Sequence, residues 1–199
     1  MTFITSVFEG IKATSLIEWF AVVSTIIYVI LVAKRLIICW LFAFVGSALF
    51  VYLCYEGNLY LESLLQFFYV IMAVVGWFSW KKSELKGNTI VKWKMNSHLL
   101  NIVISGVMAF ILGYLFDNYT NHANPYIDAF TTLYSLSATY MVTKKILGNW
   151  IYWIIIDLVS IYLYAQRDYN LTAVQYGLFT ILAVFGFFAW RKEYKTQKA

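Results

Sequence analysis

The sequence repeats itself at an offset of 110 residues, and this internal repeat limits the chain to folds built from two related halves. Residues 18–83 align with residues 128–193 without a gap, and both copies are strongly apolar. Identical residues recur at Phe20/Phe130, Lys34/Lys144, Trp40/Trp150, Tyr52/Tyr162, Leu61/Leu171, Gly76/Gly186, Phe78/Phe188, Trp80/Trp190 and Lys82/Lys192. A repeat within an apolar chain is typical of transporters whose substrate lies between two related halves.

The composition requires a lipid environment for most of the chain. Hydrophobic residues make up 62% of the 199 residues and charged residues only 13%, and the charges stand in short clusters between long apolar stretches. A soluble domain of this size could not bury so much apolar surface. We therefore expect one all-α membrane domain over residues 1–199.

The net charge of +5 does not indicate a nucleic-acid partner, because the basic residues flank the apolar stretches and form no patch of their own. Lipid headgroups are the expected contacts. Cys39 and Cys54 stand near opposite ends of one predicted helix, which excludes a disulfide between them. No metal-ligand cluster and no cofactor motif occurs in the sequence.

Seven apolar runs are long enough to cross a hydrocarbon layer of about 30 Å. We predict spans near residues 16–33, 36–54, 61–80, 98–116, 127–143, 147–165 and 170–190. The first repeat then covers about 16–83 and the second about 127–193, with a linker helix at 98–116. Because a unit of three spans reverses direction, the single linker span lets the second repeat keep the orientation of the first. The predicted architecture is 3+1+3 with parallel repeats, as in the SWEET sugar transporters.

The distribution of basic residues predicts the orientation of these spans. Thirteen of the fifteen Lys and Arg residues follow the first, third, fifth and seventh spans: Lys34, Arg35, Lys81, Lys82, Lys86, Lys92, Lys94, Lys144, Lys145, Arg191, Lys192, Lys195 and Lys198. Positive residues concentrate on the cytoplasmic side of membrane proteins. We therefore expect the N-terminus outside and the C-terminus in the cytoplasm.

Asp157 stands about midway along the sixth predicted span, with no basic residue in that span. A charge near the bilayer centre costs at least about 2.5–3.5 kcal/mol on insertion scales, so it indicates a functional site. Trp150, Trp153 and Asp157 follow the helical spacing i, i+3, i+7 and share one face. Two indole rings above a carboxylate suit a flat, positively charged ring. The alternative is that the tryptophans anchor the interface and Asp157 bonds a neighbouring Ser or Thr.

Gln66 and Gln175 stand about one turn inside the outer ends of the third and seventh spans, one position apart under the 110-residue offset. Their amides both donate and accept hydrogen bonds, which suits a carboxamide or a sugar hydroxyl. Hydrogen bonding between packed spans is the alternative role. Glu18 and Asp128 occupy matching places near the outer ends of their repeats, as carboxylates of a hydrated mouth or of a helix start do.

Several classes of function are excluded by missing motifs. The sequence has no Gly-rich phosphate loop, no lysine in the middle of a predicted span and no Ser/His/Asp or Cys/His set at one depth. We therefore expect neither ATP hydrolysis nor an enzyme activity, and facilitated diffusion is the default mechanism. A membrane scaffold or sensor that transports nothing is the rival interpretation.

Two segments resemble the PnuC family of bacterial vitamin transporters: residues 59–69, LYLESLLQFFY, with Gly76-Trp77-Phe78-Ser79-Trp80 after them, and residues 144–153, KKILGNWIYW, with Asp157. The resemblance runs from about Trp19 to Arg191. It implies a seven-span, SWEET-like fold, a homotrimer, and uptake of nicotinamide riboside across the bacterial inner membrane. Gln66 stands at the amide position of the riboside type, and Tyr69 is a further contact. Some riboside transporters carry Asn where this chain has Asp157, and thiamine, which is also cationic, is the alternative substrate.

Overall fold

The computed structural model describes residues 3–57, 60–85, 87, 89–119 and 124–198, with backbone alone at residues 60 and 61. Leu59 of the family motif and Lys86 of the basic loops lie outside these residues. The described chain forms eight helices: α1 (Phe3–Ala13), α2 (Leu16–Ala33), α3 (Cys39–Glu56), α4 (Tyr60–Glu84), α5 (Met95–Tyr119), α6 (Pro125–Thr143), α7 (Asn149–Gln166) and α8 (Asn170–Thr196).

Helices α2 to α8 correspond to the seven predicted apolar runs, and each begins within three residues of its expected start. Five of them, α2, α3, α4, α5 and α8, are long and apolar enough to cross a membrane. Helices α6 and α7 do not meet this criterion, and both carry buried polar residues, among them Asp157 and Ser160 of α7. The structure is therefore an all-helical membrane protein with several membrane-spanning helices.

Helix α1 was not expected from the sequence, because 11 residues are too few to cross a bilayer. Its residues Phe3, Ile4 and Phe8 are more than half exposed. The opposite side lies on the start of α8, where Asn170 Nδ2 donates to Ser6 Oγ at 3.0 Å. A short helix with one apolar side and one polar side is typical of a segment that lies along a membrane surface.

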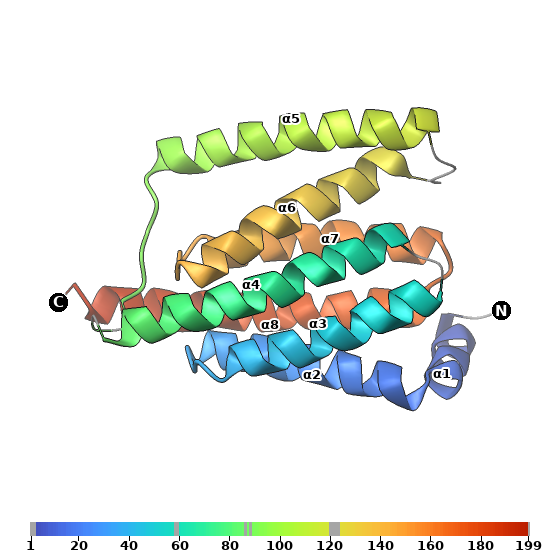
Figure 1. Ribbon diagram of the computed structural model, residues 1–199, viewed down its shortest axis with the longest axis horizontal. Coiled ribbons are helices and arrows are strands. Elements are labelled where there is room, and N and C mark those ends of the chain that lie inside the picture. Colours follow the sequence, from blue (N-terminus) through green and yellow to red (C-terminus); the bar gives the residue numbers. More distant parts are fainter. Residues whose placement is uncertain (1–2, 58–59, 86, 88, 120–123, 199) are drawn as a thin grey trace.

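The helices pack as two similar groups, which follow the repeat (Figure 1). Helix α3 packs between α2 and α4, and α7 packs on α6 and α8 in the same way. The groups meet where α2 contacts α8 and where α4 contacts α6. The 110-residue offset relates α2 to α6 and α4 to α8, so the two contacts are equivalent under the repeat. Helix α5 packs mainly on α6, reaches α7 through His98 and Tyr152, and lies along the edge of the bundle.

The turns after α2 and α6 have the same backbone design. Arg35 and Lys145 both have positive φ, 57° and 51°, at the position where helices often place glycine. Leu36 N donates to Leu31 O, and Ile146 N donates to Met141 O, which completes a Schellman motif at each helix end. We call the end of the bundle that carries these two turns the basic end, and the opposite end, where α2, α6 and α8 begin, the far end.

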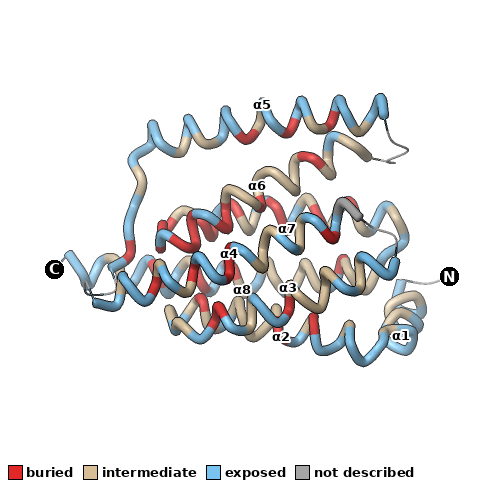
Figure 2. Tube along the Cα trace, viewed as in Figure 1, coloured by how far each residue is buried: buried red, intermediate tan, exposed pale blue. Residues whose placement is uncertain are grey.

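Buried residues concentrate towards the basic end (Figure 2). Four tryptophans form the centre of the largest core cluster: Trp40, Trp80, Trp150 and Trp190. Within each half, the first indole packs edge-on against the second, at 5.5 Å for Trp40 with Trp80 and 5.4 Å for Trp150 with Trp190. Gly76 and Gly186 make room for these rings, because a Cβ at either position would lie only 2.4–2.7 Å from the facing indole.

This packing predicts that alanine at Gly76 or Gly186 destabilises the protein. Overpacking a tight core costs about 1–3 kcal/mol, more than the gain of up to about 1 kcal/mol in helix propensity. Gly177→Ala is the matched control, because nothing lies within 4 Å of a Cβ there. Thermal unfolding in detergent should show Gly76→Ala and Gly186→Ala melting earlier and Gly177→Ala unchanged or later. Equal melting temperatures for the three variants would contradict this account.

Candidate substrate-binding site

Asp157 is buried at the middle of the bundle. It is the ninth of the 18 residues of α7, and only 3% of it is exposed. Within the described part of the chain, its carboxylate forms neither a hydrogen bond nor an ion pair. A buried carboxylate without a partner is costly, which makes Asp157 a candidate for binding a cation.

Tyr176 connects this carboxylate to tyrosines on two other helices. Tyr176 of α8 lies close enough to Asp157 and to Tyr69 of α4 to interact with both electrostatically. The Tyr69 hydroxyl is hydrogen-bonded to Ser135 of α6. Towards the far end, the rings of Tyr164 and Tyr176 stack at 5.3 Å and 12°, with a hydrogen bond between their hydroxyl groups. The centre between the two halves therefore combines one carboxylate with several groups that can donate or accept hydrogen bonds.

The two tryptophans of the predicted site have different surroundings. Trp153 is half-buried and packs against both core clusters, one turn of α7 from Asp157. Trp150 lies nearer the basic end, is 2% exposed and packs against Gly186 and Trp190. The shared helical face is present, but in this conformation neighbouring side chains cover Trp150.

The two glutamines lie nearer the far end. Gln66 and Gln175 are both half-buried. Neither amide has a hydrogen-bond partner among the described residues, so both remain available to a ligand. Tyr69 follows Gln66 by three residues on α4 and so shares its side of that helix.

Sequence reasoning missed Tyr176 and Tyr164. The 110-residue offset contains the missing signal, because it pairs Gln66 with Tyr176, whereas we paired Gln66 with Gln175 one position away. Tyr164 pairs in the same way with Cys54 and was hidden among the many aromatic residues of the chain. Places where the two repeats differ in polarity are therefore informative about the site.

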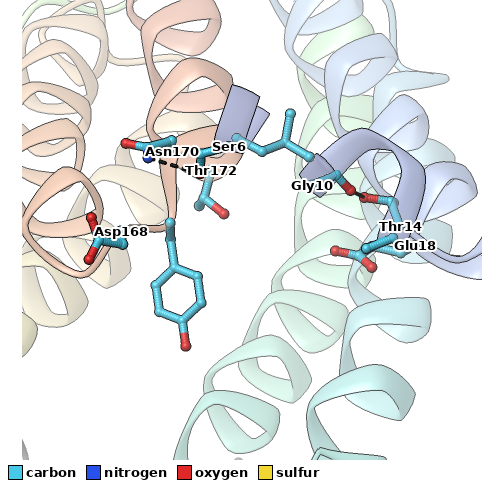
Figure 3. A pocket seen from close by; sticks show the side chains of 10 residues that line it. Ser6, Gly10, Thr14, Glu18, Asp168, Asn170 and Thr172 are labelled. Atoms are coloured by element: carbon cyan, nitrogen blue, oxygen red, sulfur yellow. Dashed lines mark hydrogen bonds between the residues drawn. The ribbon is translucent and has the colours of Figure 1, made fainter. Parts of the chain in front are cut away.

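The predicted mouth carboxylates differ between the repeats. Asp128 forms an ion pair with Arg167 at 2.7 Å. Glu18 instead lines a separate hollow of about 290 Å³ between α1 and the start of α8, with Asp168 and Asn170 on its opposite side (Figure 3). This hollow lies at the far end, several helical turns from Asp157. Among the described residues, no group of three His, Cys, Asp or Glu side chains could hold a metal ion.

Apolar spanning helices in two related groups, around a buried carboxylate, define a membrane protein that moves a small solute. Comparison with known proteins agrees. The family described as nicotinamide mononucleotide transporter matches residues 15–192. The chain therefore belongs to this transporter family, and the predicted family and transporter class are confirmed.

Several relatives are named nicotinamide riboside transporter PnuC. The protein from Escherichia coli strain K12 is 22% identical over 178 residues, covering 76% of this chain and 74% of the relative. The protein from Neisseria mucosa is 24% identical over 205 residues, covering 93% and 78%. A crystal structure of the vitamin B3 transporter PnuC superposes with a TM-score of 0.77 at 23% identity, covering 97% of this chain and 88% of that one.

Proposed function

We propose that this protein takes up nicotinamide riboside across the bacterial inner membrane by facilitated diffusion, with its two halves rocking around a site at Asp157. In this proposal α2 to α8 form seven spans in a 3+1+3, SWEET-like arrangement. The basic end faces the cytoplasm, the N-terminus lies outside, and the protein assembles as a homotrimer. The names of the relatives support the substrate.

The single observation that carries the proposal is the buried carboxylate of Asp157, which has no hydrogen-bond or ion-pair partner among the described residues. Nicotinamide riboside carries a permanent positive charge on its pyridinium ring, so it supplies the missing counter-charge. The mononucleotide adds a phosphate, for which the middle of the described bundle offers no Lys or Arg. A phosphate close to Asp157 would be repelled, which favours the riboside.

The proposed roles follow from position. Asp157 supplies the counter-charge, and Trp153 stacks on the pyridinium ring. Gln66 and Gln175, with Tyr69, bind the carboxamide and ribose hydroxyls. Trp150 completes the indole face when the halves move, and in the closed packing it supports α7 against Trp190.

Isothermal calorimetry on the purified protein tests the substrate. We expect riboside binding in the micromolar range and much weaker binding of the mononucleotide. Thiamine is the critical competitor, because its thiazolium would satisfy Asp157 equally well. Tight thiamine binding without a riboside signal would refute the proposed substrate, and binding of no vitamin would favour the scaffold interpretation.

The role of Asp157 predicts a charge-dependent loss of affinity. Asp157→Asn should weaken riboside binding by about 1.5–3 kcal/mol, the value of a hydrogen bond to a charged group. An uncharged, reduced riboside should lose much less. Trp153→Ala should weaken binding of both ligands, because stacking contributes to each. Equal losses for the charged and neutral ligands in Asp157→Asn would make Asp157 a structural residue.

Facilitated diffusion predicts that transport stops when the concentrations on the two sides are equal. Asp157 is the only acidic residue buried deep in the described helices, and as a counter-ion to the substrate it is poorly placed to carry a proton as well. Proteoliposomes should therefore equilibrate labelled riboside with or without a pH gradient. Accumulation driven by the gradient and lost in Asp157→Asn would show proton coupling instead.

A further inference from the structure

Two buried hydrogen bonds join the halves at the basic end, and they are related by the repeat. Trp80 Nε1 of α4 donates to Val142 O of α6 at 3.1 Å. Trp190 Nε1 of α8 donates to Val32 O of α2 at 3.0 Å. The two donors are 110 residues apart, and so are the two acceptors. Each half therefore donates one indole N–H to a carbonyl of the other half. The rings of Trp80 and Trp190 also lie 6.3 Å apart across the boundary.

The acceptors lie at helix ends. The carbonyls of Val32 and Val142 belong to the last turns of α2 and α6, where carbonyls lack the ordinary helical partner. Each also accepts from its Schellman turn, through Arg35 N at 2.9 Å and Lys145 N at 3.0 Å. A carbonyl oxygen has two lone pairs, so the turn and the indole together saturate it.

Charged groups outside the indoles strengthen the same closure. Arg35 Nη2 of the first half lies 2.9 Å from Glu193 Oε1 of the second. At the position that the repeat pairs with Arg35, the Nζ of Lys145 lies 4.6 Å from the centre of the Trp80 ring. Burial lowers the pKa of Lys145 to about 8, which leaves it mainly protonated at neutral pH, so the cation–π contact is retained.

The segment between α4 and α5 covers these contacts. Val91 pairs with the turn after α6, through Val91 N to Lys145 O at 2.9 Å and Leu147 N to Val91 O at 2.8 Å. The neighbouring Ile90 is 4% exposed and belongs to the tryptophan cluster. The basic end is thus closely packed, with hydrogen bonds across the boundary between the halves.

From these contacts we infer that the reciprocal bonds Trp80–Val142 and Trp190–Val32, here called the indole latch, close the substrate path at the basic end. Both must break before a substrate at Asp157 can leave on that side. The inference rests on the proposed transport function. It assigns this structure to a state closed at the basic end and gives the two tryptophans equivalent roles.

Cys39 is a native reporter for this latch. It begins α3, has no exposed surface and belongs to the tryptophan cluster, so a thiol reagent reaches it only when the basic end opens. With Cys54→Ser as the background, Trp80→Phe and Trp190→Phe keep a ring but remove the donor. Each should raise the rate of Cys39 alkylation by a bulky, impermeant maleimide roughly fivefold, and the double variant should be faster still. Trp19→Phe, in a partly exposed residue near the far end, is the matched control.

Unfolding would also expose Cys39 and raise its alkylation rate. A second variant therefore tests the indole latch by holding the basic end closed. Arg35→Cys with Glu193→Cys, in a Cys39→Ser, Cys54→Ser background, can be joined by a short reducible cross-linker. Riboside uptake should stop on cross-linking and recover on reduction. Uptake that continues in the cross-linked protein overturns the inference. The inference also fails if Trp80→Phe and Trp190→Phe leave the rate of Cys39 alkylation unchanged, or if Trp19→Phe raises that rate equally. Alkylation needs no substrate, so failure of the wild type to take up riboside refutes the proposed function alone.

Discussion

The contact between a tryptophan and a glycine in each half determines much of the rest of this structure. Trp40 lies against Gly76, and Trp150 lies against Gly186, with no space for even one methyl group between them. In a bilayer, helices gain little by hiding apolar surface from lipid, so close packing of large against small residues must hold them together. These two contacts set how near α3 and α7 come to α4 and α8, and so position the rings of Trp80 and Trp190 between the halves.

Packing contacts follow the repeat, whereas the proposed binding groups other than Trp150 do not. The 110-residue offset pairs Asp157 with Ser47, Tyr69 with Phe179, and Tyr176 with Gln66. A cationic substrate needs one counter-charge, and a second carboxylate at the same depth would add a further desolvation cost. The two halves therefore share a scaffold and contribute different chemistry to a site that has no symmetry of its own.

The sequence predicted the helices well because length and apolar content are local properties. Every predicted run became a helix, and α1 was missed because it is too short to be recognised as a span. Helical periodicity placed Trp150, Trp153 and Asp157 on one face, but it could not show that Gly186 and Trp190 cover Trp150. Which helix lies opposite a given face depends on long-range packing. For the same reason, Tyr176 became visible as a neighbour of Asp157 only in three dimensions.

The acceptors of the reciprocal indole bonds are backbone carbonyls, and this has a genetic consequence. Side-chain substitution at Val32 or Val142 changes local packing but leaves the carbonyl oxygen in place. The donors have no such protection, because among the apolar side chains only tryptophan carries a ring N–H. The two bonds together therefore depend on two codons, whereas two bonds between side chains would depend on four. After duplication of an ancestral half, selection on one tryptophan per copy would have been enough to preserve both bonds.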